Sequence, residues 1–526
     1  MPNWTRGWRA AAMAGLLALA ALAGPAAAKD FTMPWRGDVG PLNPHLYEPN
    51  EFFAQDMVYD GLVSYGPGGR ILPALAERWE VAPDGARITF HLRRGVVFSD
   101  GTPFDAQAVK LNFEQVLANK SEHDWLALVA LLTNVEALDS HTVRLTLASP
   151  YYPALQELTL IRPLRFLSPK AIPKDGTAKG IRAPIGTGPW VLAEYRENDR
   201  AVFVRNERYW GVKPSLERVV VRVMPDAAER SLAFQRGQLD MIYHDKHISL
   251  QEFKRLQANP RFAAHVSEPL ITRMVVMNAG RGPTKDPTVR RAIQHAFNRD
   301  AVIQFLFHGI EKRADALFSP AIPYCDLGLE GPAFDPDKAR ALLDEAGWVV
   351  VPGKTVRERQ GERLSLEVSY EKEIAIDQAM AQALQADLRA IGVEVTLLGE
   401  PMEKNRDRSN AGLFHLSFST SWGPPYDPHT YLSGLRLGTE GHPDHQALIG
   451  LPIWKDLDAQ IVAIMAEIDE PRRRERYRTL LTTIHDQAVY LPIAHGTNLA
   501  VTQQSVTGFG FEPQSNSIPI NRLGLR

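Results

Sequence analysis

The chain has 526 residues, and its 59 basic and 61 acidic side chains leave a net charge of −2. This near-neutral balance lacks the basic surface that nucleic-acid binding requires, so we exclude nucleic acid as a partner. The length exceeds the roughly 250–300 residues at which one hydrophobic core stops growing, which predicts at least two cores.

The first 28 residues have the composition of a secretory signal. Arg6 and Arg9 precede an apolar run over 10–23, and three alanines end the segment at Ala28. The run is too short to span a membrane, and the small residues suit a cleavage site. The segment contains no cysteine that could carry a lipid. We therefore expect a mature protein that begins near Lys29 and works outside the cytoplasm without a lipid anchor.

Strand and helix patterns alternate through the rest of the chain, which favours a mixed α/β fold. Apolar residues alternate over 88–92 and again over 143–147, as in half-buried strands. Between them, Asp105 is placed to cap a helix whose apolar side chains recur on one face as far as Leu117.

The second half of the chain contains units of helix, glycine and strand. Asp335 predicts the N-cap of a helix that ends at Gly347. Apolar residues over 380–391 predict another helix, followed by Gly392 and a strand over 393–397. Such units are typical of a lobe built from strands and the helices that cover them.

Two segments are candidates for passages of the chain between lobes. One lies near 268–278, just before the turn-forming residues 279–287. The other lies near 494–497, after the apolar run 488–493. Two passages would make the second lobe a continuous insertion into the first.

Common catalytic motifs are absent from the sequence. There is no G-x-S-x-G, no H-E-x-x-H and no G-x-G-x-x-G, and the residues before Gly353-Lys354-Thr355 have the wrong spacing for a phosphate loop. Cys325 is the only cysteine, so no intrachain disulfide is possible, and we expect this side chain to fill space in a core. The absence of these motifs argues against an enzyme with catalytic residues or a catalytic cofactor. A secreted hydrolase is the alternative of another class.

Four segments occur in a characteristic order: Gly40-Pro-Leu-Asn-Pro-His-Leu-Tyr47, Met57-Val-Tyr59, Pro184-Ile-Gly-Thr-Gly-Pro-Trp190 and Phe203-Val-Arg-Asn-Glu-Arg-Tyr-Trp-Gly211. With them the chain resembles, from about Phe31 to its end, the periplasmic solute-binding proteins that serve ABC importers of peptides and nickel. The segments 151–153, 162–166 and 422–429 resemble the nickel-binding branch of that family.

The resemblance implies a flytrap of two lobes with mixed sheets, joined by strands that cross the hinge. It divides the chain into a signal peptide (1–28), lobe one (29–268), lobe two (269–496) and a return to lobe one (497–526). It also implies a periplasmic monomer that hands its cargo to the permease of an ABC importer.

Pro425 separates the nickel-binding interpretation from the peptide-binding one. Peptide binders of the family place an aspartate three residues after the cleft tryptophan, here Trp422, and this aspartate pairs with the peptide's ammonium group. Burying an ammonium group without that carboxylate would cost about a few kcal/mol. Asp427 belongs to an Asp-Pro turn pair and is expected to cap locally. The resemblance therefore favours nickel, bound as a small chelate such as a bis-histidine complex. A di- or oligopeptide or a glutathione-like solute is the alternative.

The resemblance also implies how charge is arranged around a chelate. Arg162 would hold a chelate carboxylate, for which guanidinium has matching geometry. The alternative is an ion pair that stabilises the lobe, a role that Arg165 would also suit. Glu122 stands where the branch often has a second arginine, and Arg406 is a candidate to replace that charge. Further ligand contacts are expected from Trp125, Trp422, Tyr426, Phe52 and Asn516.

The metal ligand is expected from a loop in the second half of the chain. Imidazole suits Ni²⁺, and His442 or His445 could reach a metal when the lobes close. Two solvated loop histidines are the alternative.

A second His-x-x-His pair, His244 and His247, has no place in the expected cleft, and we predict that it lies on the surface. Gly186 and Gly188 suit a turn with unusual backbone angles, which predicts a scaffold role for that motif.

Overall fold

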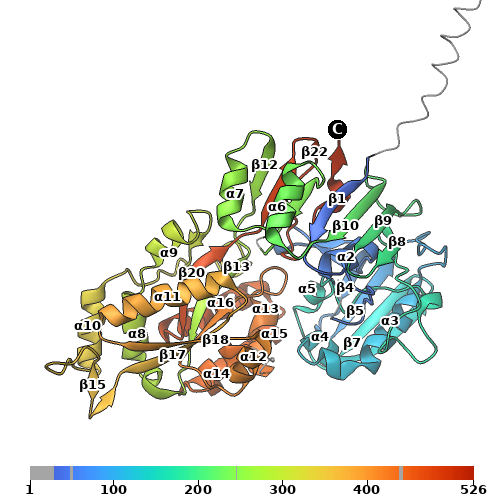
Figure 1. The fold of residues 1–526 in the computed structure, drawn as a ribbon. Coiled ribbons are helices and arrows are strands. Elements are labelled where there is room, and N and C mark those ends of the chain that lie inside the picture. Colours follow the sequence, from blue (N-terminus) through green and yellow to red (C-terminus); the bar gives the residue numbers. More distant parts are fainter. Residues whose placement is uncertain (1–28, 48–50, 245, 438–441) are drawn as a thin grey trace, which may run out of the picture.

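The computed structural model describes residues 29–47, 51–244, 246–437 and 442–526, so the predicted signal lies outside the described residues. Figure 1 shows two bodies side by side. One contains the strands β1 to β12, from the first half of the chain, and the other contains the helices α8 to α16. Within the described residues, no helix has the length and apolar character needed to cross a membrane.

Three sheets belong to the first body. In the first sheet the edge strand β1 pairs in parallel with β10, and the other pairings of these three sheets are antiparallel. The strand order of the first sheet is β1 (Phe31–Trp35), β10 (Arg218–Val223), β9 (Arg200–Arg205) and β8 (Trp190–Arg196). The order of the second is β4 (Ala76–Val81), β5 (Arg87–Leu92), β7 (Thr142–Leu147) and β6 (Leu132–Asp139). The order of the third is β11 (Met241–Tyr243), β21 (Leu499–Gln503) and β12 (Phe262–Val266).

One mixed sheet of six strands forms the second body. Its order is β14 (Lys312–Arg313), β20 (Tyr490–Gly496), β13 (Ile271–Met277), β19 (Leu416–Thr420), β17 (Ser365–Glu371) and β18 (Glu394–Glu400). Three small pairs complete the strands: β2 (Val63–Tyr65) with β3 (Ile71–Pro73), β15 (Glu358–Arg359) with β16 (Glu362–Arg363), and β22 (Val506–Thr507) with β23 (Gly524–Leu525).

The helices cover these sheets. In the first body they are α2 (Phe52–Val58), α3 (Ala106–Ala118), α4 (Ala127–Leu131), α5 (Ala154–Glu157), α6 (Ala227–Gln235) and α7 (Leu250–Gln257). In the second they are α8 (Pro287–Ala296), α9 (Arg299–Phe305), α10 (Pro336–Glu345), α11 (Ala375–Ala390), α12 (Met402–Asn410), α13 (His429–Leu437), α14 (Pro443–Leu448), α15 (Trp454–Ala466) and α16 (Glu470–Asp486). Short 3-10 turns are η1 (Pro67–Gly69), η2 (Lys120–His123), η3 (Pro169–Ala171), η4 (Gly282–Lys285) and η5 (Ile520–Arg522).

The predicted helix starts and stops are confirmed. Asp105 caps α3 by accepting a hydrogen bond from the Ala108 N–H, and Asp335 caps α10 in the same way from Lys338. Gly392 ends the unit of α11 with a φ of +88°, a region that favours glycine. These signals act within three residues of one another, which is why the sequence reveals them.

The chain passes twice between the three-stranded and the six-stranded sheet. One passage follows β12 and the other follows β20, and the two are hydrogen-bonded to each other. The Ser267 N–H donates to the Asn498 carbonyl at 3.0 Å, and the Asn498 N–H donates to Ser267 Oγ at 2.8 Å. The predicted lobe boundaries, at 268/269 and 496/497, fall in the same stretches of the chain, and these bounds stay a prediction.

Two sequence-based expectations require correction. Gly186 and Gly188 do not have positive φ; a Cβ on either would instead meet the backbone of Val58, at 2.0 Å for Gly186 and 2.5 Å for Gly188. Glycine is needed there for close approach. His247 is not on the surface but 4% exposed, with its ring against Trp35 and its Nδ1 at 2.8 Å from the Tyr243 carbonyl.

Candidate functional site

The segment from Trp422 to His429 folds around one aspartate. The Asp427 carboxylate accepts hydrogen bonds from the backbone N–H groups of Trp422 at 3.1 Å and of Gly423 at 2.8 Å. Burial raises the pKa of Asp427 to about 6, although these hydrogen bonds lower it. The carboxylate is used inside its own turn, as predicted, and is therefore not available to pair with a bound ammonium group.

Four aromatic side chains from distant parts of the chain meet beside this segment, and we call Tyr47, Trp125, Trp422 and Tyr426 the aromatic group. The ring centroid of Trp125 lies 6.3 Å from those of Trp422 and Tyr426. The centroids of Trp422 and Tyr426 are 6.2 Å apart. Trp125 precedes α4 and Trp422 follows β19, so the group joins the two bodies of the molecule.

Tyr47 was not among the predicted site residues. Its hydroxyl accepts a hydrogen bond from Trp125 Nε1 at 2.8 Å and lies 2.7 Å from His123 Nδ1. This contact holds the indole of Trp125 in its orientation. The sequence contains one signal that could have revealed it, since Tyr47 ends the first of the segments that carry the family resemblance.

The indole N–H of Trp422 is buried and has no hydrogen-bond partner among the described residues. A buried polar group without a partner is rare in a protein and costs free energy. Here the donor belongs to the aromatic group, so an acceptor atom of a ligand would satisfy it.

Arg162 is 6% exposed and lies behind the aromatic group. Its guanidinium carbon is 3.7 Å from the ring centre of Phe52 and 5.4 Å from that of Tyr47, and its Nη1 donates to the Tyr47 carbonyl. Its charge also acts on the Tyr426 hydroxyl, whose pKa burial raises to about 12. The structure thus brings Arg162, Phe52 and the aromatic group together.

Arg165 has the structural role that was the alternative for Arg162. Its Nε donates to the Leu160 carbonyl at 3.0 Å, and its Nη2 donates to the Thr159 carbonyl at 3.2 Å. The same nitrogen is 3.4 Å from Asp56 Oδ1. These contacts link neighbouring loops of one body, so Arg165 is a suitable control for experiments on Arg162.

The two loop histidines differ in their surroundings. His442 is one-third exposed, and its ring centroid lies 5.1 Å from that of Trp422. His445 has its Nδ1 at 2.6 Å from the Leu435 carbonyl and its ring against Trp454. Both line a small hollow beside Trp422. Residues 438–441 of the same loop lie outside the described residues.

Two further predicted residues are placed less closely. Arg406 lies on α12, is 42% exposed and forms an ion pair with Glu403 of the same helix. Asn516 is half-buried between two residues that reach the site region: Ser515 donates through its hydroxyl to the Pro424 carbonyl at 3.1 Å, and Ser517 donates to Asp56. The roles of Arg406 and Asn516 in binding stay predictions.

The two bodies also touch away from the aromatic group. The Tyr152 N–H donates to the Met465 carbonyl at 3.0 Å, and the hydroxyls of Tyr152 and Tyr477 are 2.5 Å apart. Arg473 lies over the Tyr152 ring at 4.1 Å. Contacts between the two bodies therefore extend beyond the aromatic group.

Glu157 is a fully buried carboxylate at this contact. It accepts hydrogen bonds from the Tyr151 hydroxyl at 2.7 Å, from the Leu128 N–H at 2.9 Å and from the Thr430 hydroxyl at 3.2 Å. Burial nevertheless raises its pKa from the ordinary 4.5 to about 7. The folded state thus binds this proton more tightly than the unfolded chain does.

We expect the Glu157→Gln variant to change how stability depends on pH. Between about pH 4.5 and 7 the wild-type protein loses stability through this group, because ionisation is easier in the unfolded chain. The variant lacks this loss, so its free energy of unfolding should rise relative to wild type by up to about 3 kcal/mol over that interval. Denaturant unfolding of both proteins across the interval measures the difference. A difference that is constant with pH would contradict the prediction.

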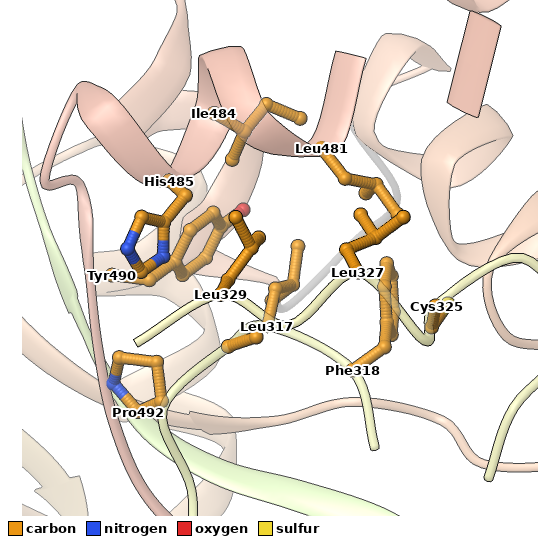
Figure 2. A pocket seen from close by; sticks show the side chains of 11 residues that line it. Leu317, Phe318, Cys325, Leu327, Leu329, Leu481, Ile484, His485, Tyr490 and Pro492 are labelled. Atoms are coloured by element: carbon orange, nitrogen blue, oxygen red, sulfur yellow. The ribbon is translucent and has the colours of Figure 1, made fainter. Parts of the chain in front are cut away.

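A second hollow lies in the other body, between residues 316–329, the end of α16 and β20 (Figure 2). Its walls are mostly leucine and other apolar side chains. His485 at its edge has Nε2 at 3.2 Å from the Glu330 carbonyl. Cys325, which is 6% exposed, lines it as part of the core, as predicted. No set of polar groups converges there among the described residues, and we assign it no ligand.

Protein side chains supply few metal ligands in this region. Within the described ranges, no three His, Cys, Asp or Glu side chains gather in a group that could hold a metal ion.

Comparison with known proteins supports the fold. A family model described as bacterial extracellular solute-binding proteins, family 5 Middle, matches residues 70–442. The chain is 42% identical over 510 residues to the nickel-binding periplasmic protein of Escherichia coli K12, with 97% of each chain covered. It is 27% identical over 483 residues to di/tripeptide-binding protein 2 of Pseudomonas aeruginosa, with 87% of each covered.

Solved structures also support the fold. NikA from Brucella suis in complex with Fe(III)-EDTA has a TM-score of 0.92 and 43% identity, covering 95% of this chain and 100% of that one. An ABC transporter substrate-binding protein from Sinorhizobium meliloti has a TM-score of 0.78 and 28% identity, with 95% and 100% covered. These likenesses confirm the predicted fold class, a two-lobed α/β fold with mixed sheets.

Proposed function

Because this chain belongs to the bacterial extracellular solute-binding proteins of family 5, we propose that it captures nickel in the periplasm as a small chelate complex and delivers it to an ABC importer. It is exported by a signal peptide over 1–28 and acts as a monomer without a lipid anchor. Lobe one comprises 29–268 and 497–526, and lobe two comprises 269–496. The protein catalyses no reaction.

The observation that carries the proposal is the aromatic group with Arg162 behind it. A chelate presents flat apolar faces, which suit Trp125, Trp422 and Tyr426, and carboxylate oxygens, which suit a guanidinium group. The buried N–H of Trp422 offers a further donor to those oxygens. The E. coli relative is named for nickel, and the Brucella structure contains a metal chelate.

His442 is the residue we place on the metal. Imidazole nitrogen is a suitable ligand for Ni²⁺, and His442 lies against Trp422 at the edge of the aromatic group. A chelate such as a bis-histidine complex would supply the other ligands.

The alternative cargo, a peptide or a glutathione-like solute, is less well supported by the residues of the site. The peptide-binding relative shares the family but is only 27% identical. Pro425 offers no carboxylate to an ammonium group, and the Asp427 carboxylate is engaged by the backbone of Trp422 and Gly423. A peptide would bury its ammonium group without a partner.

Closure of the lobes would couple binding to delivery. Hinge closure around a ligand is known for periplasmic binding proteins as a class. A chelate that touches Trp125 and Trp422 contacts both bodies, so it stabilises the closed form by its differential affinity for that form. The permease would then recognise the closed protein.

Tryptophan fluorescence of the mature protein tests the proposal. We expect saturable quenching by Ni²⁺ with L-histidine, and a much weaker response to Ni²⁺ alone or to a dipeptide mixture. Trp422→Phe is the matched control, since it keeps an aromatic ring but removes the indole N–H. A response to dipeptides alone would assign the chain to the peptide carriers, and turnover of an ester or peptide would show an enzyme.

A further inference from the structure

Asp444 is a fully buried carboxylate two residues after His442, on the first turn of α14. The Tyr431 hydroxyl donates to its Oδ1 at 2.5 Å, and the Ser419 hydroxyl donates to its Oδ2 at 3.3 Å. Tyr431 and Ser419 come from α13 and β19, so three elements hold this side chain in place.

A buried carboxylate requires compensation for the loss of water. The Tyr431 and Ser419 hydroxyls supply part of that compensation, and the Tyr490 hydroxyl also interacts with this carboxylate. An imidazole N–H is a further donor that such a carboxylate can accept from. Among the ion pairs of the described residues, the partner of Asp444 is His442, whose Nδ1 lies 3.8 Å from Asp444 Oδ2. The carboxylate therefore faces one particular nitrogen of that imidazole.

The orientation of His442 follows from its two neighbours. Asp444 lies on the Nδ1 side of the ring, and Trp422 lies against the ring at 5.1 Å. A hydrogen on Nδ1 would point to the carboxylate, and the lone pair would then be on Nε2, at the other edge of the ring. In metal sites, a carboxylate often fixes a ligating histidine in this way.

We propose that Asp444 is a positioning residue for metal binding: it holds His442 with Nδ1 toward the carboxylate, so that Nε2 presents its lone pair to the metal of the chelate. The metal-binding part of this inference rests on the proposed function. The contact between the carboxylate and the imidazole is independent of it.

A double-mutant cycle tests the inference with Ni²⁺ and L-histidine as the probe. We expect Asp444→Asn to weaken binding about 10-fold or more in the wild-type background. In the His442→Ala background the same substitution should change affinity little, because the side chain it positions is gone. Tyr431→Phe is the control, since it removes one hydrogen bond to Asp444 and leaves the charge that faces His442.

The outcomes separate the two proposals. Equal loss from Asp444→Asn in both backgrounds would show a purely structural role, and no loss in the wild-type background would likewise overturn the inference. If the wild-type protein does not bind the probe at all, the proposed function fails, and the orientation of His442 is decided by a second measurement.

That second measurement needs no variant of Asp444, which protects the test if Asp444→Asn does not fold. Selective ¹⁵N-histidine labelling reports the tautomer of each imidazole, and the His442 signal is identified by its loss in His442→Ala. At about pH 8 we expect the Nδ1–H tautomer. An Nε2–H tautomer would overturn the inference whatever the protein binds.

Discussion

Arg162→Ala is expected to weaken binding of Ni²⁺ with L-histidine by about 100-fold, or roughly 3 kcal/mol. The guanidinium is a buried positive charge beside the aromatic group, and without it a chelate carboxylate would lose its cationic partner. The substitution also removes the contact with Phe52 and the hydrogen bond to Tyr47, which should lower the free energy of unfolding by about 1–2 kcal/mol. Titration calorimetry and denaturant unfolding measure the two effects separately.

Arg165→Gln is the matched control for this experiment. Arg165 is an equally buried arginine three residues away, but it donates to the carbonyls of Leu160 and Thr159 within one body. We expect the Arg165→Gln substitution to lower stability and to leave the affinity of the folded protein unchanged. Similar affinities for wild type and Arg162→Ala would remove Arg162 from the site.

The second large effect is expected from His442→Ala. If His442 is a ligand of the metal, loss of this imidazole, which lies against Trp422, should weaken binding at least about 10-fold. His445→Ala is expected to affect stability more than binding. Its imidazole contacts the Leu435 carbonyl and packs on Trp454, so its removal should lower the melting temperature more than the affinity.

X-ray absorption at the nickel edge provides a direct check on the histidine assignment. The loaded wild-type protein and His445→Ala should show the same imidazole contribution, and His442→Ala should show a smaller one. If only His445→Ala loses it, the metal ligand is His445, and the inference about Asp444 loses its basis.

The residues around the candidate site were predicted by two different routes. Trp125, Arg162, Trp422 and Tyr426 were predicted from family resemblance, and the structure brings them together. Nothing in their spacing required this arrangement. Asp427 is different, because its local capping role followed from the Asp-Pro pair itself and is confirmed.

The sequence did not reveal the positions of residues whose contacts lie far away in the chain. Tyr47 joins the site through a hydrogen bond to Trp125, 78 residues away in the chain. Gly186 is required by the backbone of Val58 rather than by its own φ angle, and His247 is buried under Trp35. In each case the deciding neighbour lies far away in sequence.

By itself the sequence determined what short-range interactions control. The helix starts at Asp105 and Asp335, the stop at Gly392 and the strand periodicities arise within a few residues, where backbone geometry leaves few alternatives. Only the tertiary structure decided which side chains meet. The aromatic group and the Asp444–His442 contact depend on how sheets and helices pack, because burial and charge pairing act through space and not along the chain.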